Sequence, residues 1–122
     1  MSAYNQNPNH FKRLYKATGY SIAGLKSTYE HEQAFRLEVY ILAVLIPLAI
    51  WLAQTPLEWV LMLGSWIFVM IVEMLNSAVE AAIDRIGMEK HELSGRAKDI
   101  GSAAVMVSVF LAIGIWVAVL LG

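Results

Sequence analysis

The sequence predicts an all-α membrane protein in which an N-terminal amphipathic surface helix precedes three transmembrane helices. Hydrophobic residues make up 58% of the 122 residues and charged residues only 16%, which is far from the composition of a soluble domain. Three apolar segments can each supply the roughly 20 helical residues that a bilayer core of about 30 Å requires. At this length we expect a single domain over residues 1–122.

The N-terminal part of the chain reads as a polar tail followed by a helix in the membrane interface. The tail, 1–10, lacks the basic start, apolar run and cleavage site of a secretory signal peptide, so we expect no cleaved leader. The segment 11–29 interleaves aromatic and aliphatic side chains with three lysines and an arginine, which favours a helix lying flat in the interface. The alternative is a loosely ordered basic tail. Gly19 and Gly24 could break the helix.

The spans are predicted within three longer helices at 33–53, 57–83 and 95–121. In the first, Pro47 is tolerated because neighbouring helices or local distortion can satisfy the freed carbonyl group. Tryptophans flank the short turn between the first two helices, as interfacial aromatic residues do.

In the third predicted helix, Ala104, Ser108 and Ala112 recur at every fourth position, which permits close approach of another helix. Because three short helices alone cover little surface, we expect self-association. The same residues could instead pack within one subunit.

The basic residues predict the orientation in the membrane. All nine lysines and arginines precede or begin the first span, or lie between the second and third spans. Since positively charged loops remain cytoplasmic, the N-terminus and the second loop should face the cytoplasm and the C-terminus the opposite side. Nothing in the sequence supports nucleic-acid binding. The absence of cysteine excludes thiol chemistry, and a lone HEL triplet lacks the second histidine of a zinc helix.

A polar stripe runs along the second predicted span. Its members share one arc roughly 100° wide on a helix: Glu73, Asn76, Ser77, Glu80 and Asp84. Charges in a membrane are costly, so this arc should face protein or water and line a site. The alternative is that the membrane ends near Glu73 and the helix continues into the cytoplasm.

Carboxylates on this stripe suggest acid–base and metal chemistry. Glu73 follows a long apolar run, and a carboxylate partly removed from water accepts a proton more readily, so it is the best candidate for a general base. Glu80 could bind Mg²⁺ through oxygen, together with substrate phosphates. Glu32 is the available second carboxylate, although an ion pair with Arg36 is an equally good interpretation.

The segment from His91 to Ala104 combines a helix start with basic side chains. Ser94 is a possible N-cap, with Arg96 and Lys98 around the first turn, which together could bind phosphate. Positive-inside anchoring explains the same charges equally well. Asp99 within the basic cluster suggests an organised polar network.

These motifs resemble one known family. VEMLNSAVEAAIDRIG and HELSGRAKDIGSAAV, preceded by EHEQAFRLE, are similar to the prokaryotic integral-membrane diacylglycerol kinase of Gram-negative bacteria. The resemblance covers about residues 11–121 and is highly specific, because both long motifs occur in the family's order.

The resemblance implies an enzyme that transfers the γ-phosphate of MgATP to the hydroxyl group of 1,2-diacylglycerol, giving phosphatidic acid and ADP. It implies a homotrimer in the bacterial inner membrane with active sites at subunit contacts. It also implies that Glu73 is the catalytic base and that Glu32 and Glu80 bind Mg²⁺.

The resemblance extends to the two substrates. It implies ATP contacts from Arg13, Tyr20, Glu32, Glu80, Glu89, His91, Lys98 and Asp99. It implies lipid contacts from Arg13, Glu38, Glu73, Asn76 and Ser102. Lys90 departs from the family, which carries an aromatic residue there, so no specific contact is carried over to that side chain.

Other functions stay open at the level of sequence. The nearest alternative is a kinase for another lipid alcohol, notably undecaprenol. From other classes, a small oligomeric transporter could use Glu73 as a proton or cation site, whereas a pure anchor protein would need none of the carboxylates.

Overall fold

The computed structural model describes residues 9–87, 89 and 91–122, and over these residues it contains α-helices and no strand. The helices are α1 (His10–His31), α2 (Gln33–Leu52), α3 (Pro56–Ile86) and α4 (Glu92–Leu121). Most of the expected polar tail, residues 1–8, and the position of Lys90 lie outside the described part of the chain. The predicted all-helical fold is confirmed.

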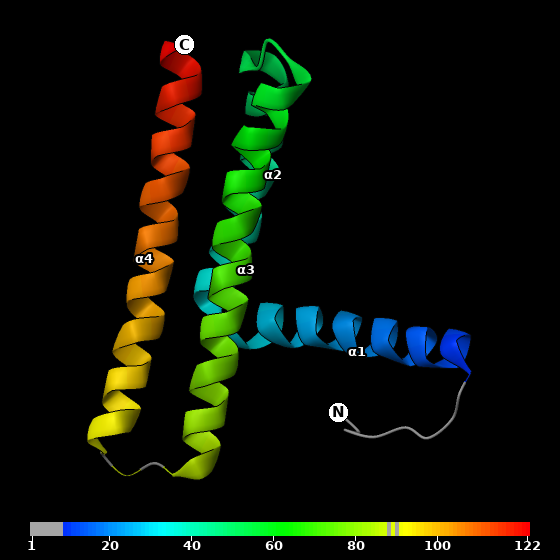
Figure 1. Ribbon diagram of the computed structural model, residues 1–122, viewed down its shortest axis with the longest axis vertical. Helices are drawn as coiled ribbons and strands as arrows, with labels where there is room; N and C mark the ends of the chain where they lie inside the picture. Colours follow the sequence, from blue (N-terminus) through cyan, green and yellow to red (C-terminus); the bar gives the residue numbers. More distant parts are fainter. Residues whose placement is uncertain (1–8, 88, 90) are drawn as a thin grey trace.

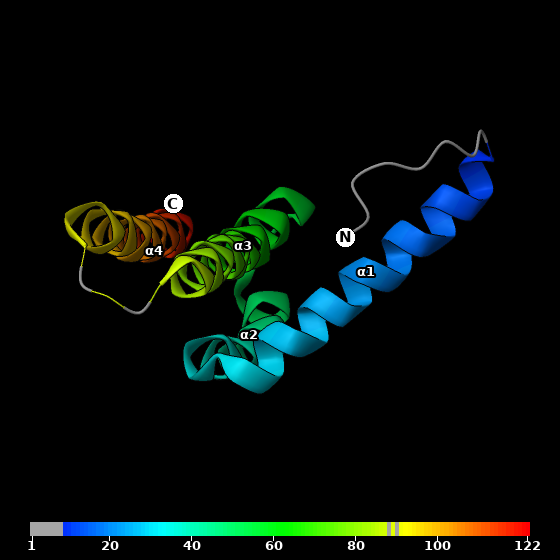
Figure 2. The ribbon, with the colours of Figure 1, turned by 90° about the horizontal axis from the view of Figure 1, so that it is seen from below.

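Three of the helices could cross a membrane. By length and composition, α2, α3 and α4 each qualify as a span, as the apolar segments predict. Figure 1 shows these three running along the long axis, while α1 extends across it from the start of α2. Figure 2, seen from below, shows α1 directed away from α3 and α4.

Helix α1 is continuous, so the break suggested by its glycines is wrong. The side chain of Asn9 caps the helix by accepting hydrogen bonds from the backbone N–H groups of Phe11 and Lys12. Gly19 and Gly24 lie inside the helix with ordinary negative φ angles. A single glycine in a helix interior costs about 1 kcal/mol, which is too little to break a helix of this length.

A tight corner joins α1 to α2 at Glu32, whose extended backbone ends one helix and begins the next. Arg36 fixes this corner, because its Nη1 donates hydrogen bonds to the carbonyl oxygens of Tyr29 at 2.8 Å and Glu30 at 2.9 Å. These carbonyls belong to the last turn of α1, where backbone acceptors lack helical partners. Arg36 therefore caps α1, and no ion pair joins it to Glu32 among the described residues.

The next two helix starts differ in how they are capped. Thr55 caps α3, followed by Pro56 in the first turn, and its hydroxyl group accepts from the N–H of Glu58. At α4 the imidazole of His91 accepts from the N–H of Leu93 at 3.1 Å. The expected N-cap at Ser94 is therefore wrong. A cap at His91 lets α4 begin at Glu92 rather than at 95, and α3 continues to Ile86 rather than ending at 83.

Helix α3 is central, because it packs against both α2 and α4. A small apolar core of Ala49, Met62 and Leu63 lies near the turn between α2 and α3. In α4, Ser108 and Ala112 are buried whereas Ala104 is exposed, so two members of the small-residue stripe are used within the subunit.

Candidate functional site

The site begins with two buried carboxylates on facing helices. Glu73 on α3 is only 7% exposed, and Glu38 on α2 is 8% exposed. Their carboxyl groups lie close enough for their charges to interact. Each sits on the buried face of its helix, since Phe35 and Val69, one turn earlier, are buried as well. Glu38, which only the resemblance implies as a lipid contact, thus lies near the predicted base.

Two further carboxylates surround Glu73. The charges of Glu32, at the α1–α2 corner, and Glu80, two turns further along α3, both act on it. Both side chains are half-buried. In the described part of the chain, no three histidine or acidic side chains form a group that could hold a metal ion by themselves.

Asn76 continues the polar face of α3 towards α4. Its Nδ2 donates a hydrogen bond to Glu80 Oε1 at 3.5 Å. Its Oδ1 and the neighbouring Ser77 Oγ are buried, and neither has a hydrogen-bond partner among the described residues. Gly101 of α4 packs so closely that a Cβ atom added there would collide with the Asn76 side chain. The polar face therefore reaches the α3–α4 contact with two unsatisfied polar atoms.

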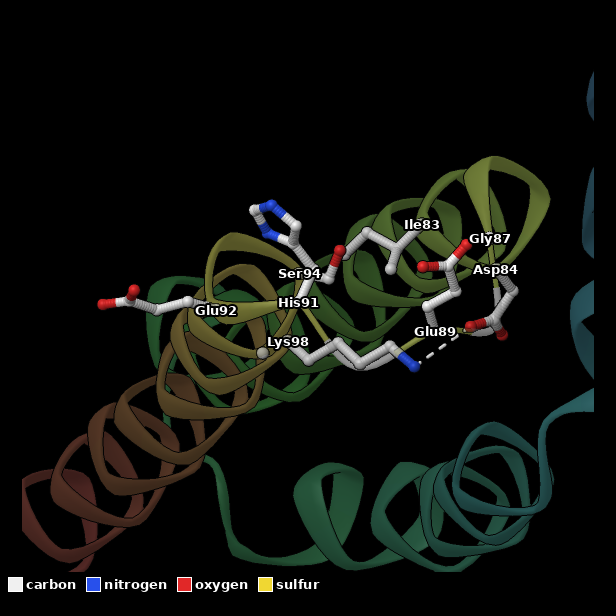
Figure 3. Close-up of a pocket in the computed structure, with 9 residues that line it drawn as sticks. Ile83, Asp84, Gly87, Glu89, His91, Glu92, Ser94 and Lys98 are labelled. Carbon is white, nitrogen blue, oxygen red and sulfur yellow. Dashed lines mark hydrogen bonds and ion pairs between the residues drawn. The ribbon is translucent and has the colours of Figure 1, made fainter.

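An open pocket of about 530 Å³ lies where α3 ends and α4 begins. Figure 3 shows the residues around it: Ile83, Asp84, Gly87, Glu89, His91, Glu92, Ser94, Gly95 and Lys98. Lys98 Nζ forms an ion pair with Asp84 Oδ1 at 3.0 Å, which links the two helices. In Figure 3 Glu92 points away from this pair. The pocket gathers three of the predicted nucleotide ligands, Glu89, His91 and Lys98.

Other predicted residues lie apart from these groups. Asp99 and Ser102 are exposed on α4. Arg13 and Tyr20 are exposed on α1, which among the helices packs mainly against α2. Figures 1 and 2 show that α1 leads away from α3 and α4, whose ends line the pocket. A single chain therefore brings the carboxylates together and forms the pocket, but does not bring the surface-helix residues to either.

Several polar contacts have no signal in the sequence. The indole N–H of Trp66 donates to the backbone carbonyl of Glu38 at 3.0 Å, and that of Trp116 donates to Met62 at 2.9 Å. Hydroxyl groups of Tyr29 and Tyr40 form a hydrogen bond of 2.9 Å, which raises the pKa of Tyr29. Such contacts join residues far apart in sequence, and no spacing rule relates them.

The chain is similar to a known protein family over most of its length. Residues 19–120 match the model of the family described as prokaryotic diacylglycerol kinase. A diacylglycerol kinase of Haemophilus influenzae is 49% identical over 88% of this chain and 91% of its own length. The Escherichia coli K12 enzyme of the same name is 48% identical over 90% of both chains. A Pseudomonas aeruginosa diacylglycerol kinase is 45% identical over 91% of this chain and 90% of its own.

Proposed function

The chain belongs to the prokaryotic diacylglycerol kinase family, and on this premise we propose how its residues phosphorylate a membrane lipid. The reaction is transfer of the γ-phosphate of ATP to the hydroxyl group of 1,2-diacylglycerol, giving phosphatidic acid and ADP. This chemistry recycles diacylglycerol into phospholipid metabolism. The observation that supports this function best is Glu73, a buried carboxylate that follows the apolar part of α3 and precedes the end of the helix that lines the pocket.

Glu73 acts as the general base. The lipid hydroxyl oxygen attacks the γ-phosphorus, the bond from phosphorus to the bridging oxygen of ADP breaks, and the hydroxyl proton passes to the Glu73 carboxylate. Its burial keeps competing water away from the attacking group. Glu38, Asn76 and Ser102 contribute polar groups around the lipid glycerol, together with Arg13 from a surface helix.

Glu32 and Glu80 are the residues that would hold Mg²⁺. Two carboxylates fit this ion, because protein-bound Mg²⁺ keeps several waters and takes its remaining ligands from substrate phosphates. When bound, Mg²⁺ neutralises charge on the phosphate groups. The Asn76 amide, hydrogen-bonded to Glu80, orients that carboxylate.

The nucleotide occupies the α3–α4 pocket. The pocket opens to solvent, contains the Lys98 ammonium group, and begins on α3 at Ile83, one turn beyond Glu80. Lys98 supplies positive charge near the phosphates, while Asp84 fixes its position. The remaining nucleotide contacts come from Glu89, His91, Asp99, Arg13 and Tyr20.

Completion of the site requires other subunits. Since α1 leads away from the pocket of its own chain, Arg13 and Tyr20 serve the site of a neighbour in a homotrimer. The protein is a multi-pass protein of the bacterial inner membrane, with the pocket, the N-terminus and the second loop on the cytoplasmic side, where ATP is available. The C-terminus then faces the periplasm.

The test is phosphate transfer from labelled ATP in mixed micelles, with diacylglycerol and undecaprenol offered side by side. We expect phosphatidic acid to form only with Mg²⁺. In Glu73→Gln, turnover should fall about a hundredfold or more, the range that a positioned general base contributes, while nucleotide binding persists. The matched control is Glu58→Gln at the opposite end of α3, where glutamine also satisfies the helix-start motif.

The same assay identifies the outcomes against the proposal. Preferential labelling of undecaprenol would show that the enzyme is a kinase for that lipid alcohol instead. Wild-type turnover in Glu73→Gln would show that Glu73 is not the general base. If neither lipid were phosphorylated by folded wild-type protein, the kinase function itself would fail and ion-flux assays would follow.

A further inference from the structure

One hydrogen bond joins the two helices that carry the buried carboxylates. Trp66 of α3 is half-buried, and its Nε1 donates to the backbone carbonyl oxygen of Glu38 in α2 at 3.0 Å. Among the described residues it is the only side-chain hydrogen bond between α2 and α3. Interhelical hydrogen bonds of this kind help set the relative position of membrane helices, where no hydrophobic driving force acts between them.

Trp66 lies on the same face of α3 as Glu73. It precedes Glu73 by seven residues, or about two helical turns, and the buried residues Met62 and Val69 lie on the same face. On α2, the bond holds the backbone of Glu38 itself. The indole therefore joins the face that carries Glu73 directly to the residue that carries the second buried carboxylate.

The side chain of Glu38 has no comparable restraint. Its Oε1 is buried and has no hydrogen-bond partner among the described residues. A buried carboxylate oxygen without a partner is costly and should accept a bond from a ligand. Because no hydrogen bond of its own fixes the Glu38 carboxylate, its position near Glu73 depends on how α2 packs against α3.

We propose that Trp66 is a positioning residue for the lipid substrate. By holding the Glu38 carbonyl, the indole N–H sets the Glu38 carboxylate beside Glu73, where it can accept a hydrogen bond from the glycerol headgroup of diacylglycerol. The inference rests on the proposed function and names a residue that touches neither substrate. It assigns to Trp66 an effect on lipid binding and none on nucleotide binding.

The test compares Trp66→Phe with Trp116→Phe, which removes an equivalent indole–carbonyl bond between α4 and α3 near the apolar core. For Trp66→Phe we expect the KM for diacylglycerol to rise roughly three- to tenfold, the range of one interhelical hydrogen bond in a membrane. The KM for ATP should stay at the wild-type value. Trp116→Phe should leave both KM values unchanged. Equal KM values for diacylglycerol in the two variants would overturn the proposal.

A second variant separates the bond from the loss of volume. Benzothienylalanine at position 66 keeps the bicyclic shape and lacks the N–H, so it should reproduce the rise in KM for diacylglycerol. A wild-type KM with this isostere would show that packing alone matters and would overturn the proposal.

A double variant tests whether the effect passes through Glu38. In a Glu38→Gln background, Trp66→Phe should change the KM for diacylglycerol much less than it does in the wild type, because the positioned carboxylate is already gone. Simple additivity would count against the proposal. Wild-type turnover is measured in every series, so failure of the kinase function appears there, independently of Trp66.

Discussion

At the scale of single residues, the closest packing in the site is between Asn76 and Gly101. The amide needs the space that a missing Cβ provides, because any larger residue at position 101 meets the Asn76 side chain. This contact brings α4 against the polar face of α3 at the level of the proposed site. Glycine in a helix interior ordinarily costs about 1 kcal/mol relative to alanine, so its presence here has a packing reason.

We therefore expect Gly101→Ala to destabilise the protein by about 1–3 kcal/mol, the range of overpacking, and to lower turnover. The measurements are thermal unfolding in detergent and phosphate transfer. Gly114→Ala is the matched control on the same helix, because nothing lies within 4 Å of its added Cβ. That control should unfold at the wild-type temperature or slightly above it. An equal rise in stability for both variants would contradict the close contact.

At the scale of elements, the direction of α1 depends on a corner only one residue long. Arg36 holds this corner by donating to two carbonyl groups in the last turn of α1, and the Tyr29–Tyr40 hydrogen bond adds a second link. These contacts set how α1 leaves α2 and so, in the proposed trimer, which site Arg13 and Tyr20 would reach. The corner thus has a proposed role in assembling the site, beyond joining two helices.

Arg36→Ala should loosen this corner. Loss of the two bonds is worth about 1–3 kcal/mol net, which corresponds to roughly five- to 150-fold more of the opened form. Limited proteolysis in nanodiscs should then cleave faster at residues 29–33. The control is Arg96→Ala, which removes an exposed ion pair with Glu92 and should leave the cleavage rate unchanged. Equal cleavage of both variants would show that Arg36 does not hold the corner.

At the scale of the whole molecule, the single chain leaves much of its apolar surface exposed. Large hydrophobic side chains on all three candidate spans are exposed, and few hydrophobic residues in the described part of the chain are buried. Lipid can cover such surfaces, but it cannot supply Arg13 and Tyr20 to the pocket. We propose a trimer with shared sites because Arg13 and Tyr20 lie apart from the pocket of their own chain.

Mixing two inactive variants tests this arrangement. Glu73→Gln and Arg13→Ala subunits, each nearly inactive alone, are unfolded, combined in equal amounts and refolded together. If Glu73 and Arg13 of one site come from different subunits, random mixing gives about one intact site in four, and that share of wild-type turnover should return. Native mass spectrometry checks that mixed trimers formed. Mixed trimers without activity would place both residues of each site in one subunit.

The fold class follows from the sequence alone, because an apolar run of about 20 residues has few folded options other than a membrane-spanning helix. Motif spacing also placed Glu73, Asn76 and Glu80 on one face of a helix, since the helical repeat is fixed. The pairings across helices come from the packing: the charge of Glu73 acts on Glu38, Lys98 pairs with Asp84, and Trp66 bonds to the Glu38 carbonyl. It also replaced Ser94 by His91 as the cap of α4 and gave Arg36 its place at the end of α1. Helical periodicity relates residues within one helix. Contacts between helices depend on how the helices pack, which residue spacing along the chain does not predict.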